Sequence, residues 1–344
     1  MSKCLLAPRC VLPIFGCFLA GAFTMLHAQE LRVPANNNGN PGGERYIEEG
    51  QPAVMIHPTA EAAEAAVEAR ASRARVHNAS TANDLYYHGG VGGIGVEPAP
   101  KVYLIMWGSQ WNGNDPSGEE SILYNFFRGV GGSSWMNSVT QYCQGVATGT
   151  VYCNSSGTHA GNPSGILAGA WYDNAIAAPS HPSQSQLAGE AVRAAQFFGN
   201  STSAKNASVQ YVIATAHGHN AGGFGTQYCA WHSSTSSTVG RIAYTNLPYI
   251  TDAGASCGAN FNGLGSKAGI TIVEGHEMTE TMTDQFPNGG WLDSSGEENG
   301  DKCAWISSGQ GASARVSLST GSFPVQSLWS NAFNRGAGGC VLSY

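Results

Sequence analysis

Charged residues are scarce in this chain of 344 residues. Asp, Glu, Lys and Arg make up 11% of it, against about 25% in an average soluble protein. The formal net charge at pH 7 is -7, and no run of Lys and Arg occurs. Because nucleic acids are bound through clustered basic side chains, the sequence argues against a nucleic-acid partner.

Several catalytic and binding motifs are also missing. The sequence has no CxxC pair, which argues against a thiolate zinc site and a thioredoxin-like site. It has no GxSxG nucleophile elbow and no glycine-rich phosphate loop. Serine hydrolases of the elbow type and nucleotide-binding proteins are therefore poor interpretations.

Long apolar runs are absent except near the start. Lys3 and Arg9 precede an apolar run from Cys10 to Met25, and small residues surround a plausible cleavage point after Ala28. The run is short and contains proline and glycine, so it predicts a signal peptide over residues 1–28 and no membrane anchor in the mature form. We therefore expect a secreted protein, extracellular or periplasmic.

Six cysteines remain after the predicted signal peptide, and an even number in an exported chain indicates disulfides. Closeness in sequence favours three neighbouring pairs, which are Cys143 with Cys153, Cys229 with Cys257, and Cys303 with Cys340.

The amino-acid composition of the sequence changes near residue 85. Residues 29–85 contain no cysteine and include an expected Ala/Glu/Arg-rich helix, TAEAAEAAVEARASRARV, so they are interpreted as a propeptide or an N-terminal extension. Residues 86–344 form the predicted catalytic domain. Strands are expected at 101–108 and 209–218, helices at 119–130, 185–199 and about 269–286, and short strands after residue 303. This order predicts an α/β fold, a mixed sheet with packed helices.

The few acidic residues are concentrated. Eight of the 15 Asp and Glu residues from Tyr86 onward lie between residues 274 and 301, a window without Lys or Arg. Like charges so close together raise one another's pKa and destabilise a fold unless a cation or water satisfies them. A bound metal is the simplest explanation.

The start of this window lies in the stretch VEGHEMTETMTD, residues 273–284. On a helix, His276 and Glu280 project from one face and can hold one ion, while Glu277 lies beside them. The spacing matches that of the HExxH zinc helix, with Glu280 in place of the second histidine ligand. It predicts a zincin-like active-site helix in which Glu277 is the general base. Glu298 is the predicted third ligand, with three alternatives, Asp293, Glu297 and His232. The loop DSSGEENGD also offers the oxygen ligands that calcium prefers.

A second group of histidines follows the strand at 209–218. His217 and His219 are two residues apart, and His232 follows Cys229. We expect His232 or His219 to stabilise an oxyanion at the metal site.

Three stretches resemble the plant EXORDIUM, or phosphate-induced protein 1, family. They are YYHGGVGGIGVEPAPKVYLIMWGSQW, YCAWHS with IAYTNLPYI, and TMTDQFPNGGW, within residues 86–305. The plant members of that family are secreted cell-wall proteins linked to growth signalling and do not keep the HExxE helix, so their function is not carried over to this chain. Because it has an HExxE helix, the chain looks like a member of a microbial branch of that family that carries the site residues of a metallopeptidase.

These observations lead to one main hypothesis, a secreted zinc metallopeptidase made as a zymogen that acts on protein or peptide substrates. The alternative is a non-catalytic EXORDIUM-type binding protein of the cell wall, with calcium or no metal in the acidic segment. A glycosidase with paired carboxylates is a third interpretation, although such a pair has no need of His276.

Overall fold

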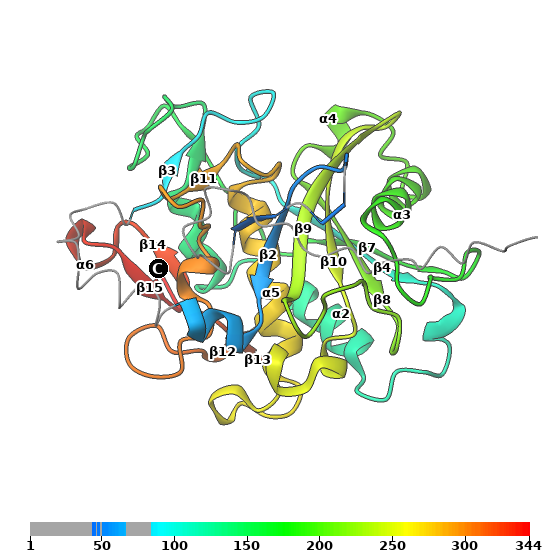
Figure 1. Cartoon of the computed structure of the whole chain (residues 1–344). Coiled ribbons are helices and arrows are strands. Elements are labelled where there is room, and N and C mark those ends of the chain that lie inside the picture. Colours follow the sequence, from blue (N-terminus) through cyan, green and yellow to red (C-terminus); the bar gives the residue numbers. More distant parts are fainter. Residues whose placement is uncertain (1–42, 46, 49, 67–83) are drawn as a thin grey trace, which may run out of the picture.

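The computed structural model describes residues 43–45, 47–48, 50–66 and 84–344 (Figure 1). The predicted signal peptide, and the part of the predicted N-terminal helix beyond residue 66, lie outside these residues. Residues 60–66 are helical. Within the described ranges, no helix is both long enough and apolar enough to cross a membrane.

A seven-stranded sheet forms the centre of the molecule, in the order β1-β2-β9-β10-β8-β4-β7. The strands are β1 (Gly43–Arg45), β2 (Val54–Pro58), β4 (Lys101–Trp107), β7 (Leu167–Asp173), β8 (Val209–Thr215), β9 (Tyr228–Ser237) and β10 (Gly240–Leu247). Strands β10, β8, β4 and β7 are parallel, whereas β9 runs antiparallel to both β10 and β2. The sheet is therefore mixed, as the sequence predicts.

Helices cover both faces of this sheet (Figure 1). Helix α3 (Gln184–Phe197) packs on one face, where Leu187 and Ala191 meet Ile105 and Ile213. Helices α2 (Glu119–Val130) and α5 (Ala268–Thr283) pack on the other, where Phe126 joins one core with residues of α5 and the sheet. With both faces covered, strands β4 and β8 are apolar in most positions, which explains the two continuous runs in the sequence.

Short elements complete the fold. The remaining strands are β3 (Tyr86–Tyr87), β5 (Cys143–Gln144), β6 (Thr158–His159), β11 (Trp291–Leu292), β12 (Ala314–Leu318), β13 (Gly321–Val325), β14 (Leu328–Ser330) and β15 (Gly339–Val341). The remaining helices are η1 (Ser109–Trp111), η2 (Met136–Gln141), α4 (Ser203–Asn206), η3 (Ile250–Cys257), η4 (Phe261–Gly263), η5 (Asp301–Cys303) and α6 (Phe333–Gly336).

The three predicted disulfides are confirmed, since Cys143–Cys153, Cys229–Cys257 and Cys303–Cys340 are bonded. The second of these joins the start of β9 to the end of η3. The third joins η5, which begins at the last residue of the acidic loop (residues 293–301), to β15. The acidic loop and the edge of β9 are thus each fixed close to a covalent cross-link.

The N-terminal segment takes part in the sheet. Strands β1 and β2 come from the region interpreted as a propeptide or an N-terminal extension, and β2 pairs along β9 from Val54 to Pro58. All five residues of β2 are buried. Neither strand was predicted from the sequence.

Candidate functional site

Helix α5 is the element on which the candidate site is built. All sixteen of its residues are buried, since it lies between the sheet and a layer formed by α2, η2 and β13. A helix enclosed on every side is normally apolar. Helix α5 nevertheless carries His276 and three glutamates into the interior, where an uncompensated charge is costly.

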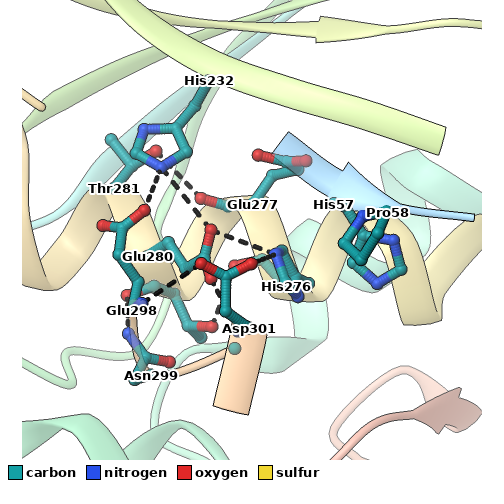
Figure 2. Close-up of polar contacts among 12 residues, drawn as sticks. His57, Pro58, His232, His276, Glu277, Glu280, Thr281, Glu298, Asn299 and Asp301 are labelled. Carbon is teal, nitrogen blue, oxygen red and sulfur yellow. Dashed lines mark hydrogen bonds and ion pairs between the residues drawn. The ribbon is translucent and has the colours of Figure 1, made fainter. Parts of the chain in front are cut away.

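Two imidazoles and a carboxylate meet at one point beside α5 (Figure 2). His276 Nε2 lies 3.0 Å from Glu280 Oε2, one helical turn away. His232, on β9, faces α5 and places its Nε2 3.6 Å from the same Glu280 oxygen. Glu280 Oε2 therefore lies between two ring nitrogens, and none of the three side chains is exposed to solvent.

The acidic loop brings two more carboxylates to this point. Glu298 Oε2 is 2.9 Å from His232 Nε2. Asp301 Oδ1 is 3.8 Å from His276 Nε2, and the Asp301 N–H donates to Glu280 Oε1 at 2.9 Å. The amide of Asn299 holds the loop against α5, because it donates to the Thr279 carbonyl and to the Thr283 hydroxyl.

Gln326 orients His276 from the opposite side. Its amide nitrogen donates to the Gly300 carbonyl at 2.8 Å, which leaves its Oε1 as the acceptor 3.3 Å from His276 Nδ1. We therefore place the proton of a neutral His276 on Nδ1. The lone pair of Nε2 then points at Glu280 Oε2, and two acceptors 3.0 Å apart need a proton or a cation between them.

Several buried polar atoms at this point have no hydrogen-bond partner among the described residues. They are His276 Nε2, Glu280 Oε2, Asp301 Oδ1, Glu298 Oε1 and both carboxylate oxygens of Glu277. In the described part of the chain, two groups have ligand atoms within 4.8 Å of one another, namely His276 with Glu280 and Asp301, and His232 with Glu277 and Glu280. Orphaned ligand atoms that converge in this way fit a metal ion.

Burial and mutual repulsion set the charges of these acids. Burial raises the pKa of Glu277, Glu298 and Asp301 well above the ordinary value, and the neighbouring carboxylates raise it further. Burial acts in the same direction on Glu280, but the adjacent imidazoles, His276 foremost, outweigh it and lower the pKa of Glu280. Glu280 is thus held as a carboxylate, as a metal ligand must be.

Five of the six residues predicted from the sequence come together here, namely Glu277, His232, His276, Glu280 and Glu298. The sixth, His219, does not join them. It lies in the loop after β8, where its Nδ1 contacts the His217 carbonyl at 3.2 Å, and it belongs to neither group of ligand atoms. His217 pairs with Asp252 instead. The spacing of two residues after a strand did not reveal that the chain turns away from the sheet.

The predicted third ligand is also placed differently from the expectation. Glu298 contacts His232, whereas Asp301 supplies the oxygen that lies with His276 and Glu280. Asp301 lies 21 residues after Glu280 and three after Glu298, so the sequence presented it only as one of the eight clustered acids. His57, whose ring centroid is 4.0 Å from that of His276, gave no signal in the sequence.

Asp293, the first acid of the loop considered for calcium, has both carboxylate oxygens bound within the protein. Asp293 Oδ1 accepts from the N–H groups of Ser295 and Glu297, and its other oxygen is 2.7 Å from Lys302 Nζ. Lys302 lies one residue beyond the window without basic residues. Asp293 is therefore neutralised by an ion pair within the protein, which argues against a calcium site at this carboxylate.

The chain has no recognisable relatives in three comparisons. No family model matches it. No curated protein matches it, and no solved structure matches it.

Proposed function

We propose that this protein is a zinc metallopeptidase that hydrolyses peptide bonds. The observation that carries the proposal is the convergence of His276 Nε2, Glu280 Oε2 and Asp301 Oδ1 on one buried point, beside a second glutamate of the HExxE helix. One imidazole and two carboxylates suit zinc as ligands, and they are donated by a rigid helix and a loop fixed to it.

A zinc ion bound by these residues would polarise the scissile carbonyl and make an attacking water acidic. Glu277 is placed to accept the proton of that water, because neither of its carboxylate oxygens has a hydrogen-bond partner among the described residues and it belongs to the same cluster as Glu280. Its raised pKa, caused by burial, lets it pass that proton on to the leaving amine. His232 is placed to stabilise the oxyanion, with Glu298 as its partner.

The proposed setting is extracellular. Three disulfides are compatible with an oxidising compartment, and the signal peptide and the propeptide remain predictions of the sequence. The likeness to the EXORDIUM family also stays a proposal that rests on the quoted motifs.

The substitution Glu277→Gln tests the mechanism. We expect hydrolysis of a protein substrate such as casein to fall by at least about a thousandfold, because the general base is lost. The zinc content should remain at one ion per chain, because Glu277 is not among the proposed ligands.

Glu274→Gln is the matched control. Glu274 lies one turn before Glu277 on α5, is also fully buried, and has no partner for either oxygen among the described residues, yet it belongs to neither ligand group. The Glu274→Gln variant should hydrolyse the substrate at a rate within a few fold of that of the unaltered chain. Equal loss in both variants, or full activity of Glu277→Gln, would contradict the proposed role. Calcium alone in the purified protein would favour the binding-protein alternative.

A further inference from the structure

Strand β2 lies between β1, the edge strand, and β9, at the side of the sheet that faces the candidate site. It pairs antiparallel with β9, so that Met55 lies opposite His232 and His57 lies opposite Ala230. Directly opposite residues of an antiparallel pair point to the same face. Met55 and His57 therefore point toward α5, as His232 does, and β2 presents alternate side chains to the catalytic cluster.

His57 reaches the cluster itself (Figure 2). Its ring packs edge-on against that of His276 with centroids 4.0 Å apart, and its Nε2 lies 3.2 Å from the same Gln326 oxygen that orients His276. On the next residue, the Pro58 carbonyl accepts from the indole N–H of Trp305 at 2.8 Å. One strand of the N-terminal segment thus touches a proposed ligand and the group that orients it.

With β2 in place, the cluster is closed to solvent. Glu277, Glu280 and His276 have no exposed surface, and neither has His57. A peptide substrate cannot reach Glu277 in this state. Because the proposed reaction needs access for an extended chain, some covering element has to leave.

The N-terminal segment is attached in a way that permits its departure. Residues 43–66 contain no cysteine, and the three disulfides lie wholly within residues 143–340. Besides the backbone pairing with β9, the segment accepts bonds at its own carbonyls, from Ser233 to Ala53 at 2.6 Å and from Gln184 to Pro52 at 2.8 Å. Its side chains add contacts through Glu48, His57 and Glu61. A substrate backbone can accept equivalents of the two carbonyl bonds, since these do not depend on the side chains of the segment.

Without β1 and β2, the sheet keeps five strands and β9 becomes its edge. An exposed edge offers a row of free N–H and C=O groups, which bind an extended chain by adding a strand. The bound strand would again place alternate side chains beside His232 and His276.

We propose that residues 43–66 are an intramolecular inhibitor that occupies the docking edge for an extended peptide substrate. After the segment is displaced, a substrate pairs with β9 in the direction that β2 now takes. This inference rests on the proposed peptidase function for the identity of the substrate, but the displacement of the segment can be measured without catalysis.

Two methionines provide a matched pair of variants in the full chain. Met55, on β2, and Met106, on β4, have exposed fractions of 0% and 1%. Truncation to alanine removes similar apolar contacts from both, but only Met55→Ala weakens the attachment of the segment. We expect Met55→Ala to raise peptide hydrolysis at least tenfold over the unaltered chain and to speed hydrogen exchange of the β9 amides. Met106→Ala should do neither.

The outcomes separate the two proposals. If neither variant speeds exchange of β9, or if both do so equally, the segment is a permanent part of the sheet and the inference is overturned. If Met55→Ala frees the β9 amides without any hydrolysis, the segment is detachable and the proposed peptidase function fails instead.

A reversible disulfide lock between β2 and β9 tests whether preventing the displacement of the segment prevents hydrolysis. Val54 lies directly opposite Ser233, at a separation that suits a disulfide, so Val54→Cys with Ser233→Cys should tie β2 to β9. Added to the Met55→Ala chain, the lock should abolish the gained hydrolysis and restore β9 protection until a reductant is added. Cysteines at Ser236 and Arg241, which are opposite each other on β9 and β10, are the control and should change neither. A locked chain that hydrolyses peptides as fast as this control would exclude displacement.

Discussion

Glu97 shows what a single buried carboxyl does to the stability of this fold. Its Oε2 accepts from the Gln210 amide at 2.7 Å, its other oxygen has no partner among the described residues, and burial raises its pKa from 4.5 to about 8. Because the folded state holds this proton more tightly than the unfolded state, Glu97 lowers the free energy of unfolding as the pH rises from 4.5 to 8.

The substitution Glu97→Gln removes this titration while it keeps the size of the side chain. The slope contributed by Glu97 is at most about 1.4 kcal/mol per pH unit. We expect the variant to gain stability over the unaltered chain above pH 8 and to gain little near pH 4.5, as measured by denaturant unfolding at both pH values. A difference that is constant with pH would show that Glu97 is ionised in the folded protein.

Asp301 and Glu298 compete for the role of third metal ligand. Asp301 Oδ1 lies with His276 and Glu280, whereas Glu298 contacts His232. Asp301→Asn should therefore weaken zinc binding at least about a hundredfold in a competition titration with a chelator. Glu298→Gln should weaken it by about tenfold at most, since Glu298 contacts His232, which is not among the proposed ligands. If Glu298→Gln weakens zinc binding more than Asp301→Asn does, Glu298 is the third ligand, as the sequence predicts.

Gly300 lies where the acidic loop packs against helix α5. A Cβ at this position would lie 2.6 Å from His276 Nδ1 and 2.9 Å from Glu280 Oε1, which is closer than real Cβ atoms approach. Gly300→Ala should push the loop away from α5 and lower both zinc affinity and hydrolysis by about tenfold or more. Gly189→Ala, on α3, has nothing within 4 Å of the added carbon and should leave both unchanged. Equal zinc affinity in the two variants would show that the loop absorbs the added atom.

The elements that local sequence determines are the ones that were predicted well. The strands at β4 and β8 and the helices α2 and α3 lie where apolar runs and helical periodicity place them. Helix α5 ends at Thr283 rather than near Phe286. The reason is that the Asp284 carboxylate turns to accept from the N–H groups of Asn288, Gly289 and Gly290.

What the sequence could not reveal depends on contacts between distant residues. The run VMIHP at 54–58 is too short to predict a strand alone, and its paired residues on β9 lie 170 to 179 residues away. His57 looked unremarkable because its neighbours in space, His276 and Gln326, come from the far end of the chain. Asp301 was seen only as one acid among eight, since spacing along a loop does not fix which oxygen reaches a helix.

The scarcity of charge becomes informative when the whole molecule is considered. A chain with only 11% charged residues places several of its acids in the interior, around α5. Buried carboxylates without cationic partners oppose folding. A divalent cation would convert this unfavourable cluster into a stabilising one, so metal binding and global stability should be linked.

Metal removal tests this link. A ligand that binds only the folded state adds about 2.7 kcal/mol of stability at a free concentration one hundred times its Kd. We expect a chelator to lower the Tm of the purified chain by several degrees and zinc to restore it in a concentration-dependent manner, measured by scanning calorimetry. His276→Ala should show a low Tm that zinc does not raise, because a ligand is missing. If the chelator leaves the Tm unchanged, or if calcium restores it as well as zinc does, the acidic cluster is stabilised by some means other than the proposed zinc ion.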